Sequence, residues 1–173
     1  QNLSALIDDV LDFSKIEAGA LRLENAPFSL DAILNTVAVV ISAGTAGKPV
    51  EALFDVAPDV PDGLIGDAMR VQQILVNLAG NAAKFTAAGR ITLRCRNDEP
   101  RRTLQISVSD TGIGIPPEKQ EWVFERFTKV DPFKPGSGIG LYLCRLIVTR
   151  LGGDIRVCPE YSGGCCIRIE RPY

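Results

Sequence analysis

The chain has 173 residues, of which 46% are apolar, and a formal net charge of −2 with no histidine. This length allows one hydrophobic core, so we expect a single domain with a short appendage. The absence of histidine excludes Ser-His-Asp hydrolysis, Cys-His chemistry and most catalytic zinc sites. Scattered basic residues and a slight negative charge argue against a nucleic-acid-binding surface. Any chemistry must therefore use carboxylates, amides, lysines and the backbone, which favours nucleotide binding.

The sequence contains no signal for membrane insertion or secretion. No stretch approaches the roughly 18 uncharged apolar residues of a membrane span, and the N-terminus lacks a signal-peptide pattern. We therefore expect a soluble, cytoplasmic chain without membrane contact of its own. It begins at Gln1 inside an expected helix, so we interpret it as a piece of a longer protein, which leaves open a membrane anchor in the parent.

Five cysteines are present without a CxxC pair. They predict neither an even disulfide framework nor a zinc site. Cys95, Cys144 and Cys158 are interpreted as reduced residues of the core.

The first helix is expected over residues 1–19, where apolar side chains recur at helical spacing and Gly19 stands where a helix would stop. Its broad apolar face would pack either on its own domain or on a bundle partner. A short strand is expected near residues 21–23 or near Phe28. Ser29 or Asp31 can then cap a helix that runs to about Ser42.

The rest of the chain mixes helices and strands without regular βαβ alternation. This order predicts an α+β fold, a two-layer sandwich, rather than a doubly wound sheet. Expected are strands at 50–56, 91–96, 104–109, 155–158 and 166–169, loops at 58–63, 110–117 and 128–137, and helices at 67–86, 118–126 and 138–151.

The helix expected at 67–86 carries a polar stripe beside its apolar face. Asn77, Asn81, Lys84 and Phe85 fall on neighbouring turns because they are spaced by three and four residues. Amides at the edge of a core face are costly unless something satisfies them. A solvated flank would explain a single Asn. Two Asn residues followed by a Lys could instead hold a hydrated Mg²⁺ and the phosphates around it.

Two glycine-rich loops follow this helix. Asp110 ends an alternating strand and opens the sequence DTGIGIP. A carboxylate in that position can accept a hydrogen bond from an exocyclic amine, although an ordinary turn with a surface Asp has the same composition. The sequence GSGIG at 136–140 opens a helix, whose N-terminus favours an anion. It is neither a dinucleotide fingerprint nor a P-loop, because no strand precedes it and no GK[ST] ends it.

The order of these motifs resembles the sensor histidine kinase family. The helix of Asn77 and Asn81, then DTGIGIP, FERF at 124–127 and GSGIGL resemble the successive boxes of its catalytic domain. LIDDVLDFSKIEAG resembles the end of its dimerisation helix, and SGGCCIRIERP is similar to its last glycine box in weaker form. The resemblance implies two parts: the C-terminal part of the dimerisation and phosphoacceptor helix at 1–20, and the catalytic ATP-binding domain at 21–173.

The resemblance also implies the sandwich shared with the gyrase, chaperone and mismatch-repair ATPases. In that fold a mixed sheet of about five strands packs on three helices, here with an additional N-terminal helix. Nucleotide would bind between the helix of Asn81 and the loop after Phe127.

A site for ATP and Mg²⁺ follows from the resemblance. Asp110 would bind the adenine amino group and Phe85 would pack on the ring. Asn81 would ligate Mg²⁺, supported by Asn77, and Lys84 would meet the phosphates. Asn77 and Lys84 are the candidate catalytic residues. The other candidate cofactor-binding residues are Gly112, Gly114, Ile115, Phe127, Gly136, Gly138, Gly140 and Leu141.

The implied reaction transfers the γ-phosphoryl group of ATP to a histidine on the dimerisation helix, and then to an aspartate of a response regulator. The parent would be a homodimer. Because the chain has no histidine, we expect it to bind ATP without autophosphorylating. The sequence departs from the family's pattern in two places, which puts the reaction rate and the order of the lid in question. The lid at 128–135 is short, with Lys129 and Lys134 as its cations. Ser162 and two cysteines stand in the last glycine box, where the family tends to have Gly and Ser or Thr.

Three other functions stay open. A pseudokinase would bind nucleotide or a partner without turnover, although the intact Asp110 and asparagines weigh against it. A gyrase-like or chaperone-like ATPase would hydrolyse ATP, but the catalytic glutamate that such relatives generally carry is replaced here by Asn77. The main role could also be dimer contact through residues 1–19.

Overall fold

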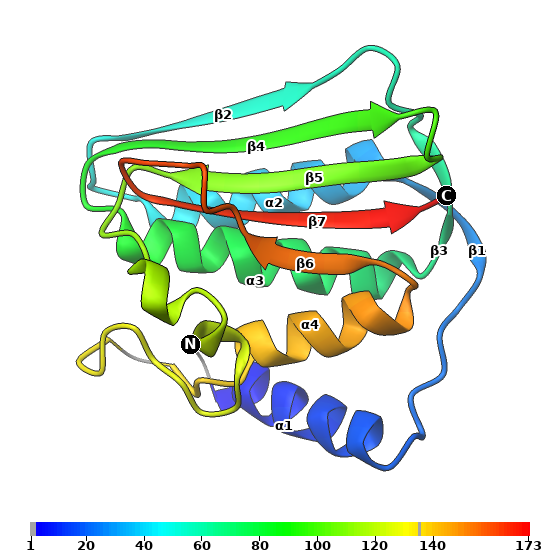
Figure 1. Cartoon of the computed structure of the whole chain (residues 1–173), viewed down its shortest axis with the longest axis horizontal. Helices are drawn as coiled ribbons and strands as arrows, with labels where there is room; N and C mark the ends of the chain where they lie inside the picture. The colour runs from blue at the N-terminus through cyan, green and yellow to red at the C-terminus, as the bar shows by residue number, and fades with distance from the viewer. Residues whose placement is uncertain (1–2, 135) are drawn as a thin grey trace.

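The structure, a computed structural model, describes residues 3–134 and 136–173. Helices cover one face of a sheet, and the N-terminal helix lies outside them (Figure 1). The sheet strands are β2 (Val50–Val56), β4 (Gly89–Asp98), β5 (Thr103–Asp110), β6 (Asp154–Val157) and β7 (Cys165–Pro172), and the helices are α1 (Leu3–Glu17), α2 (Leu30–Gly44), α3 (Ala68–Phe85) and α4 (Gly140–Arg150).

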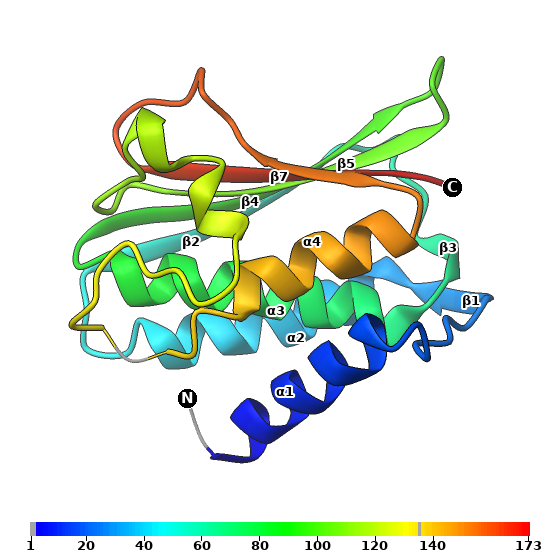
Figure 2. The same ribbon diagram turned by 60° about the horizontal axis from the view of Figure 1, so that its bottom comes forward.

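The five strands form a mixed sheet in the order β2-β4-β5-β7-β6. β2 runs parallel to β4, and the other neighbours are antiparallel. Figure 2 shows α2, α3 and α4 together beneath one face, with α1 farther from the sheet. The predicted α+β sandwich of five strands on three helices is confirmed.

Alternation along the central strands determines which face the helices cover. Successive side chains of a strand point to opposite faces. Leu93 and Cys95 of β4 therefore lie beside their partners Val108 and Ile106 of β5, and all four are buried. Leu75 of α3 is fully buried in the same cluster. The apolar stripe predicted for α3 thus packs on the sheet, which leaves its neighbouring polar stripe at the edge of the core.

Side chains cap two of the helices, and the cap at Ser29 was predicted. Ser29 precedes α2, and its hydroxyl accepts a hydrogen bond from the amide of Ala32 at 3.2 Å. Asp67 precedes α3 and accepts from the amides of Arg70 at 3.1 Å and Glu24 at 2.9 Å. Such caps satisfy amides that have no partner within the helix. Asp67 additionally joins the segment after α1 to the start of α3.

A second, two-stranded sheet differs from the sequence prediction. β1 (Ala26–Ser29) pairs antiparallel with β3 (Gly63–Gly66), at the end of what was expected to be a loop. Of the two positions expected for a short strand, Phe28 lies in β1, whereas residues 21–23 form no strand. β3 is only four residues long, with glycine at both ends. Because β3 pairs with a strand far away in the sequence, its own four residues show no pattern that predicts a strand.

The elements between residues 117 and 140 also differ from the prediction. Instead of one helix at 118–126, the chain makes two 3₁₀ turns, Pro117–Lys119 and Trp122–Phe124. Short segments of this kind commonly stay 3₁₀. α4 begins at Gly140 rather than at Gly138. Gly138 has a φ of 73°, a left-handed conformation that an α-helix does not accept.

α1 packs against α4 and the start of α3. The rings of Phe13 and Tyr142 lie 5.8 Å apart, and Arg70 donates to Asp12 at 2.8 Å in a largely buried ion pair. Several apolar side chains on α1 stay exposed nevertheless. They are Leu3, Ile7, Val10 and Leu11. Gln1 and residue 2 of the predicted helix, like Pro135 of the predicted lid, lie outside the described residues.

Within residues 3–134 and 136–173, none of the helices has the length and apolar character needed to cross a bilayer.

Candidate functional site

Two adjoining cavities lie along α3. The inner one, of about 60 Å³, is an apolar slot between α3 and the sheet that contains Asp110. The outer one, of about 590 Å³, extends along α3 beneath the loop that leads to α4. Asn81, Phe85, Val130 and Leu141 line both. An elongated ligand could therefore place an apolar ring in the slot and a polar tail in the outer cavity.

Asp110 is the acidic group of the inner slot and is 6% exposed. It is the last residue of β5, the middle strand of the sheet. Its Oδ1 accepts hydrogen bonds from the amides of Gly112 at 2.8 Å and Cys165 at 3.4 Å. Burial raises the pKa of this carboxyl, and the two amides act in the opposite direction. Both of these bonds end on Oδ1, which leaves Oδ2 for a ligand donor.

The loop after β5 shapes the rim of the slot. Gly114 and Ile115 line it. Gly112 does not, but it supports Asp110 and has no room for a side chain, because a Cβ there would lie 2.3 Å from the carbonyl oxygen of Phe85. The glycines of DTGIGIP therefore allow close approach of this loop to α3 as well as a turn.

The amide strip of α3 faces the outer cavity. Asn77, Asn81 and Lys84 all line it, so the three residues lie on one side of the helix, as their spacing predicts. Gly140 at the start of α4 lies against Asn77, and a Cβ on Gly140 would come within 3.1 Å of the Asn77 Oδ1 atom. The first turn of α4 thus meets the amide strip directly.

Lysines surround the outer cavity. Lys84, Lys129 and Lys134 line it together with Asp131. Burial lowers the pKa of Lys84, and repulsion from Lys129 and Lys134 lowers it further, while Asp131 opposes the shift. Positive charges held this close favour an anionic ligand, which would relieve their repulsion.

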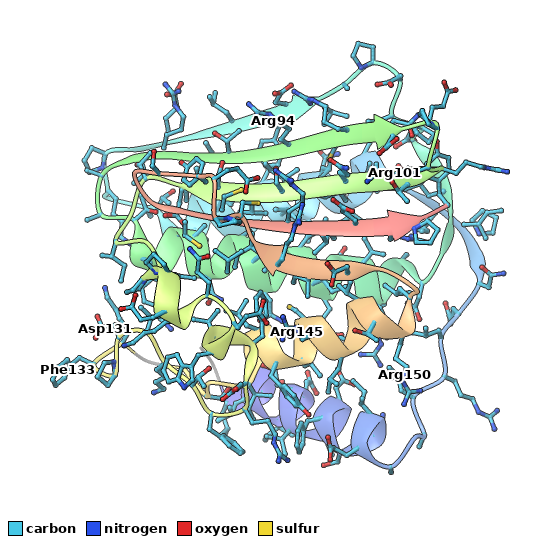
Figure 3. The ribbon with its side chains drawn as sticks, in the orientation of Figure 1. Arg94, Arg101, Asp131, Phe133, Arg145 and Arg150 are labelled. Carbon is cyan, nitrogen blue, oxygen red and sulfur yellow. The ribbon has the colours of Figure 1, made fainter. Side chains whose placement is uncertain are left out.

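The loop from Thr128 to Ile139 forms the outer wall. Gly136, Ser137 and Gly138 line the cavity. Figure 3 shows Phe133 at the tip of this loop, directed away from the body, and its side chain is 94% exposed. Phe127, a predicted cofactor-binding residue, lies outside both cavities and is 68% exposed. Its backbone amide instead donates to Gly138 at 2.9 Å and holds the base of the loop.

The sequence reasoning missed several residues of the site. Cys165 lines the slot and donates to Asp110, and Tyr161 donates from its hydroxyl to the Asp110 carbonyl at 3.0 Å. Their closeness to Asp110 depends on the pairing of β5 with β7, which no motif encodes. Ala5 and Asp9 of α1 line the outer cavity, 68 or more residues before Asn77 in the chain.

The residues at hand would suit a magnesium ion only together with a ligand. No group of three or more His, Cys, Asp or Glu side chains within the described residues could hold a metal. Asn81 and Asn77 offer amide oxygens, and Mg²⁺ commonly takes one or two protein oxygens with the rest from phosphates and water. The donor set therefore fits a metal that arrives with a phosphate chain.

Comparison with known proteins assigns the chain to a family. Residues 66–173 match the family of histidine kinase-, DNA gyrase B-, and HSP90-like ATPases. The chain belongs to this family. It carries the catalytic ATPase domain of the type found in two-component sensor histidine kinases.

Individual relatives agree with this assignment. The chain is similar to the signal transduction histidine-protein kinase BarA of Escherichia coli strain K12, at 41% identity over 89% of the chain and 18% of the relative. It is 39% identical to the sensor protein GacS of Pseudomonas syringae over 90% of the chain and 18% of the relative. The chain thus spans about a fifth of the length of these curated relatives.

A solved structure is similar over nearly the whole chain. Full-length ShkA in complex with AMPPNP superposes with a TM-score of 0.86 at 33% identity, over 97% of this chain and 35% of that one. This similarity supports the ATP-binding domain that the sequence motifs implied.

Replacement of the buried carboxylate tests its environment. Asp110→Asn should keep the fold and raise the free energy of unfolding at neutral pH, because the amide can accept from Gly112 and Cys165 without burying a charge. The pKa of Asp110 is raised in the folded state, so the wild type loses stability as pH rises through that pKa. The difference between the two proteins should therefore vanish well below pH 3.8, the ordinary value. Urea unfolding at pH 3 and pH 7 measures this. A variant less stable than the wild type at pH 7 would contradict it.

Proposed function

We propose that this chain binds ATP with Mg²⁺ and presents the γ-phosphoryl group for transfer to a histidine of the dimerisation helix. The observation that supports this best is the continuity of the site. A buried carboxylate at one end of an apolar slot is followed by two amides and three lysines in the adjoining cavity. Adenine, metal and phosphates require these groups in this order.

The inner slot is proposed to hold adenine. Oδ2 of Asp110 would accept from the exocyclic amine, a charge-assisted bond worth about 1.5–3 kcal/mol. Phe85 and Ile115 would contact the ring, with Leu141 between the slot and the outer cavity. Gly112 and Gly114 would keep the entrance open.

The outer cavity is proposed to hold the phosphates and the metal. Asn81 would ligate Mg²⁺, and Asn77, one helical turn earlier, would support it. Lys84, Lys129 and Lys134 would neutralise phosphate charge. Mg²⁺, when bound, would neutralise charge on the phosphate oxygens. Asn77 and Lys84 would contribute to the rate by positioning and charge stabilisation, as is general in phosphoryl transfer.

The lid is proposed to complete the site. Gly136, Gly138 and Gly140 would let the loop and the N-terminus of α4 approach the phosphates, where helix amides favour an anion. Phe127 would act at the base of this loop rather than in contact with the nucleotide, since its side chain is exposed.

Residues 1–20 are proposed to be the end of the dimerisation helix, and 21–173 the catalytic domain. The exposed apolar side chains of α1 support this division, because a helix hairpin from each of two chains would bury them in a four-helix bundle. The parent would accordingly be a homodimer that passes phosphate to a response-regulator receiver domain. We place this portion of it in the cytoplasm.

The metal role of Asn81 can be tested directly. Asn81→Leu should abolish most of the gain in ATP affinity that Mg²⁺ gives the wild type, a loss of about tenfold or more. Asn81→Asp is the matched control, because it keeps an oxygen ligand. Calorimetric titration of ATP with Mg²⁺ or with EDTA measures the gain. Equal Mg²⁺ dependence in the wild type and Asn81→Leu would remove Asn81 from the metal site.

The acceptor side of the reaction has its own test. The chain contains no histidine, so incubation with Mg²⁺ and γ-labelled ATP should leave it unlabelled. Acid-stable phosphate on the purified chain, detected after acid treatment and electrophoresis, would show transfer to a residue that a histidine kinase does not use.

A further inference from the structure

Cys158 and Cys166 lie on the face of the sheet that the helices do not cover. Their neighbours Val157 and Ile167 belong to the hydrophobic core, and alternation turns the two cysteines to the other side. The amide of Cys158 donates to the Cys166 carbonyl at 2.8 Å, so the residues stand opposite each other on adjacent strands. Cys95, Cys144 and Cys158 are all buried, as the sequence predicted. Cys95 and Cys144 belong to the main core cluster, and Cys158 lies outside it.

The two sulfur atoms are in contact. The Cys166 thiol donates to the Cys158 sulfur across 3.4 Å. A disulfide bond is about 2.05 Å long and joins Cβ atoms about 3.5–4.5 Å apart, while opposite residues of antiparallel strands have Cβ atoms about 4.5–5.5 Å apart. A shift of about 1 Å between the strands would therefore bring the sulfurs to bonding distance.

The surroundings favour a thiolate on Cys158. The hydrogen bond from Cys166 lowers the pKa of Cys158 below its ordinary value, and the positive charges of Arg168 and Arg156 act in the same direction, against burial and Glu160. Burial instead raises the pKa of Cys95, of Cys144 and of Cys165 to about 12. Thiolates react and thiols do not, so the cysteines differ in reactivity.

Both cysteines are buried, and the loop at 159–164, which joins β6 to β7, lies beside them. Pro159, Glu160, Ser162 and Gly163 of this loop are exposed. Surface loops of this kind open locally at low free-energy cost, which gives buried neighbours brief access to solvent.

We propose that Cys158 and Cys166 form a modification site, a dithiol that a hydroperoxide oxidises to a disulfide. The Cys158 thiolate attacks the O–O bond, which yields a sulfenic acid and releases hydroxide or alkoxide. The Cys166 thiol then attacks the sulfenic sulfur, the S–S bond forms, and water leaves with the thiol proton. Two thiol sulfurs are oxidised and one peroxide is reduced.

The disulfide would act on the nucleotide slot, a consequence that rests on the proposed function. Cys165, adjacent to Cys166, lines the slot and donates to Asp110. Gly164 packs so closely that a Cβ there would lie 1.9 Å from the Asp110 carbonyl oxygen. A shift of this strand end would change the support of the carboxylate. Because the loss of one hydrogen bond is at stake, ATP affinity should fall about threefold to tenfold.

Peptide mapping after peroxide treatment tests the site. The reduced chain is treated with hydrogen peroxide, alkylated, digested without reductant and analysed by mass spectrometry. We expect a linked pair of peptides containing Cys158 and Cys166, reversed by dithiothreitol and missing in Cys158→Ser and in Cys166→Ser. Cys165→Ser should keep the link. A link through Cys165, or equal peroxide reaction at Cys95 and Cys144, would overturn the proposal.

Calorimetry on the reduced and oxidised chains tests the coupling. Equal ATP affinity of the two forms would overturn the action on the slot while the peptide map stands. If the reduced, folded chain does not bind ATP, the proposed function fails. The peptide map still tests whether Cys158 and Cys166 form a disulfide.

Discussion

The site depends on the carboxylate of Asp110, which is buried and accepts hydrogen bonds from two backbone amides. Asp110 ends the middle strand of the sheet, where burial disfavours its charge, and amides from two separate segments partly offset that cost. One amide comes from the glycine loop after β5 and the other from the start of β7. Sheet register therefore determines the geometry of the slot, and a ligand that donates to the remaining oxygen recovers part of the desolvation cost.

The outer cavity uses the opposite charge in a similar way. Lys129 and Lys134 repel the positive charge of Lys84, and Asn77 and Asn81 line the same cavity. The buried charge of Asp110 and the repulsion at Lys84 thus both cost free energy in the protein without ligand. A ligand with a ring that donates a hydrogen bond and an anionic chain would reduce both costs. Because α3 contributes to both cavities, its packing on the sheet fixes the distance between them.

The sequence predicted what is periodic or local and missed what depends on pairing. Spacing along α3 placed Asn77, Asn81 and Lys84 on one face because a helix has a fixed period. Asp110 was found because it ends a strand and begins a glycine loop. The short strand β3 and the contact between Cys158 and Cys166 were missed, because they arise from strand register. Cys158 was correctly expected to be buried and reduced, but its position opposite Cys166 follows from strand register and could not be predicted.

Titration of ATP with Mg²⁺ into the wild type and Asp110→Asn, by calorimetry on proteins shown to be folded, tests the central claim most directly. The account predicts binding by the wild type and a loss of about 10- to 100-fold in the variant, because the charge-assisted bond to adenine is lost. Equal affinity in the two proteins, or no binding by the folded wild type, would contradict the assignment of Asp110 as the adenine acceptor of an ATP site.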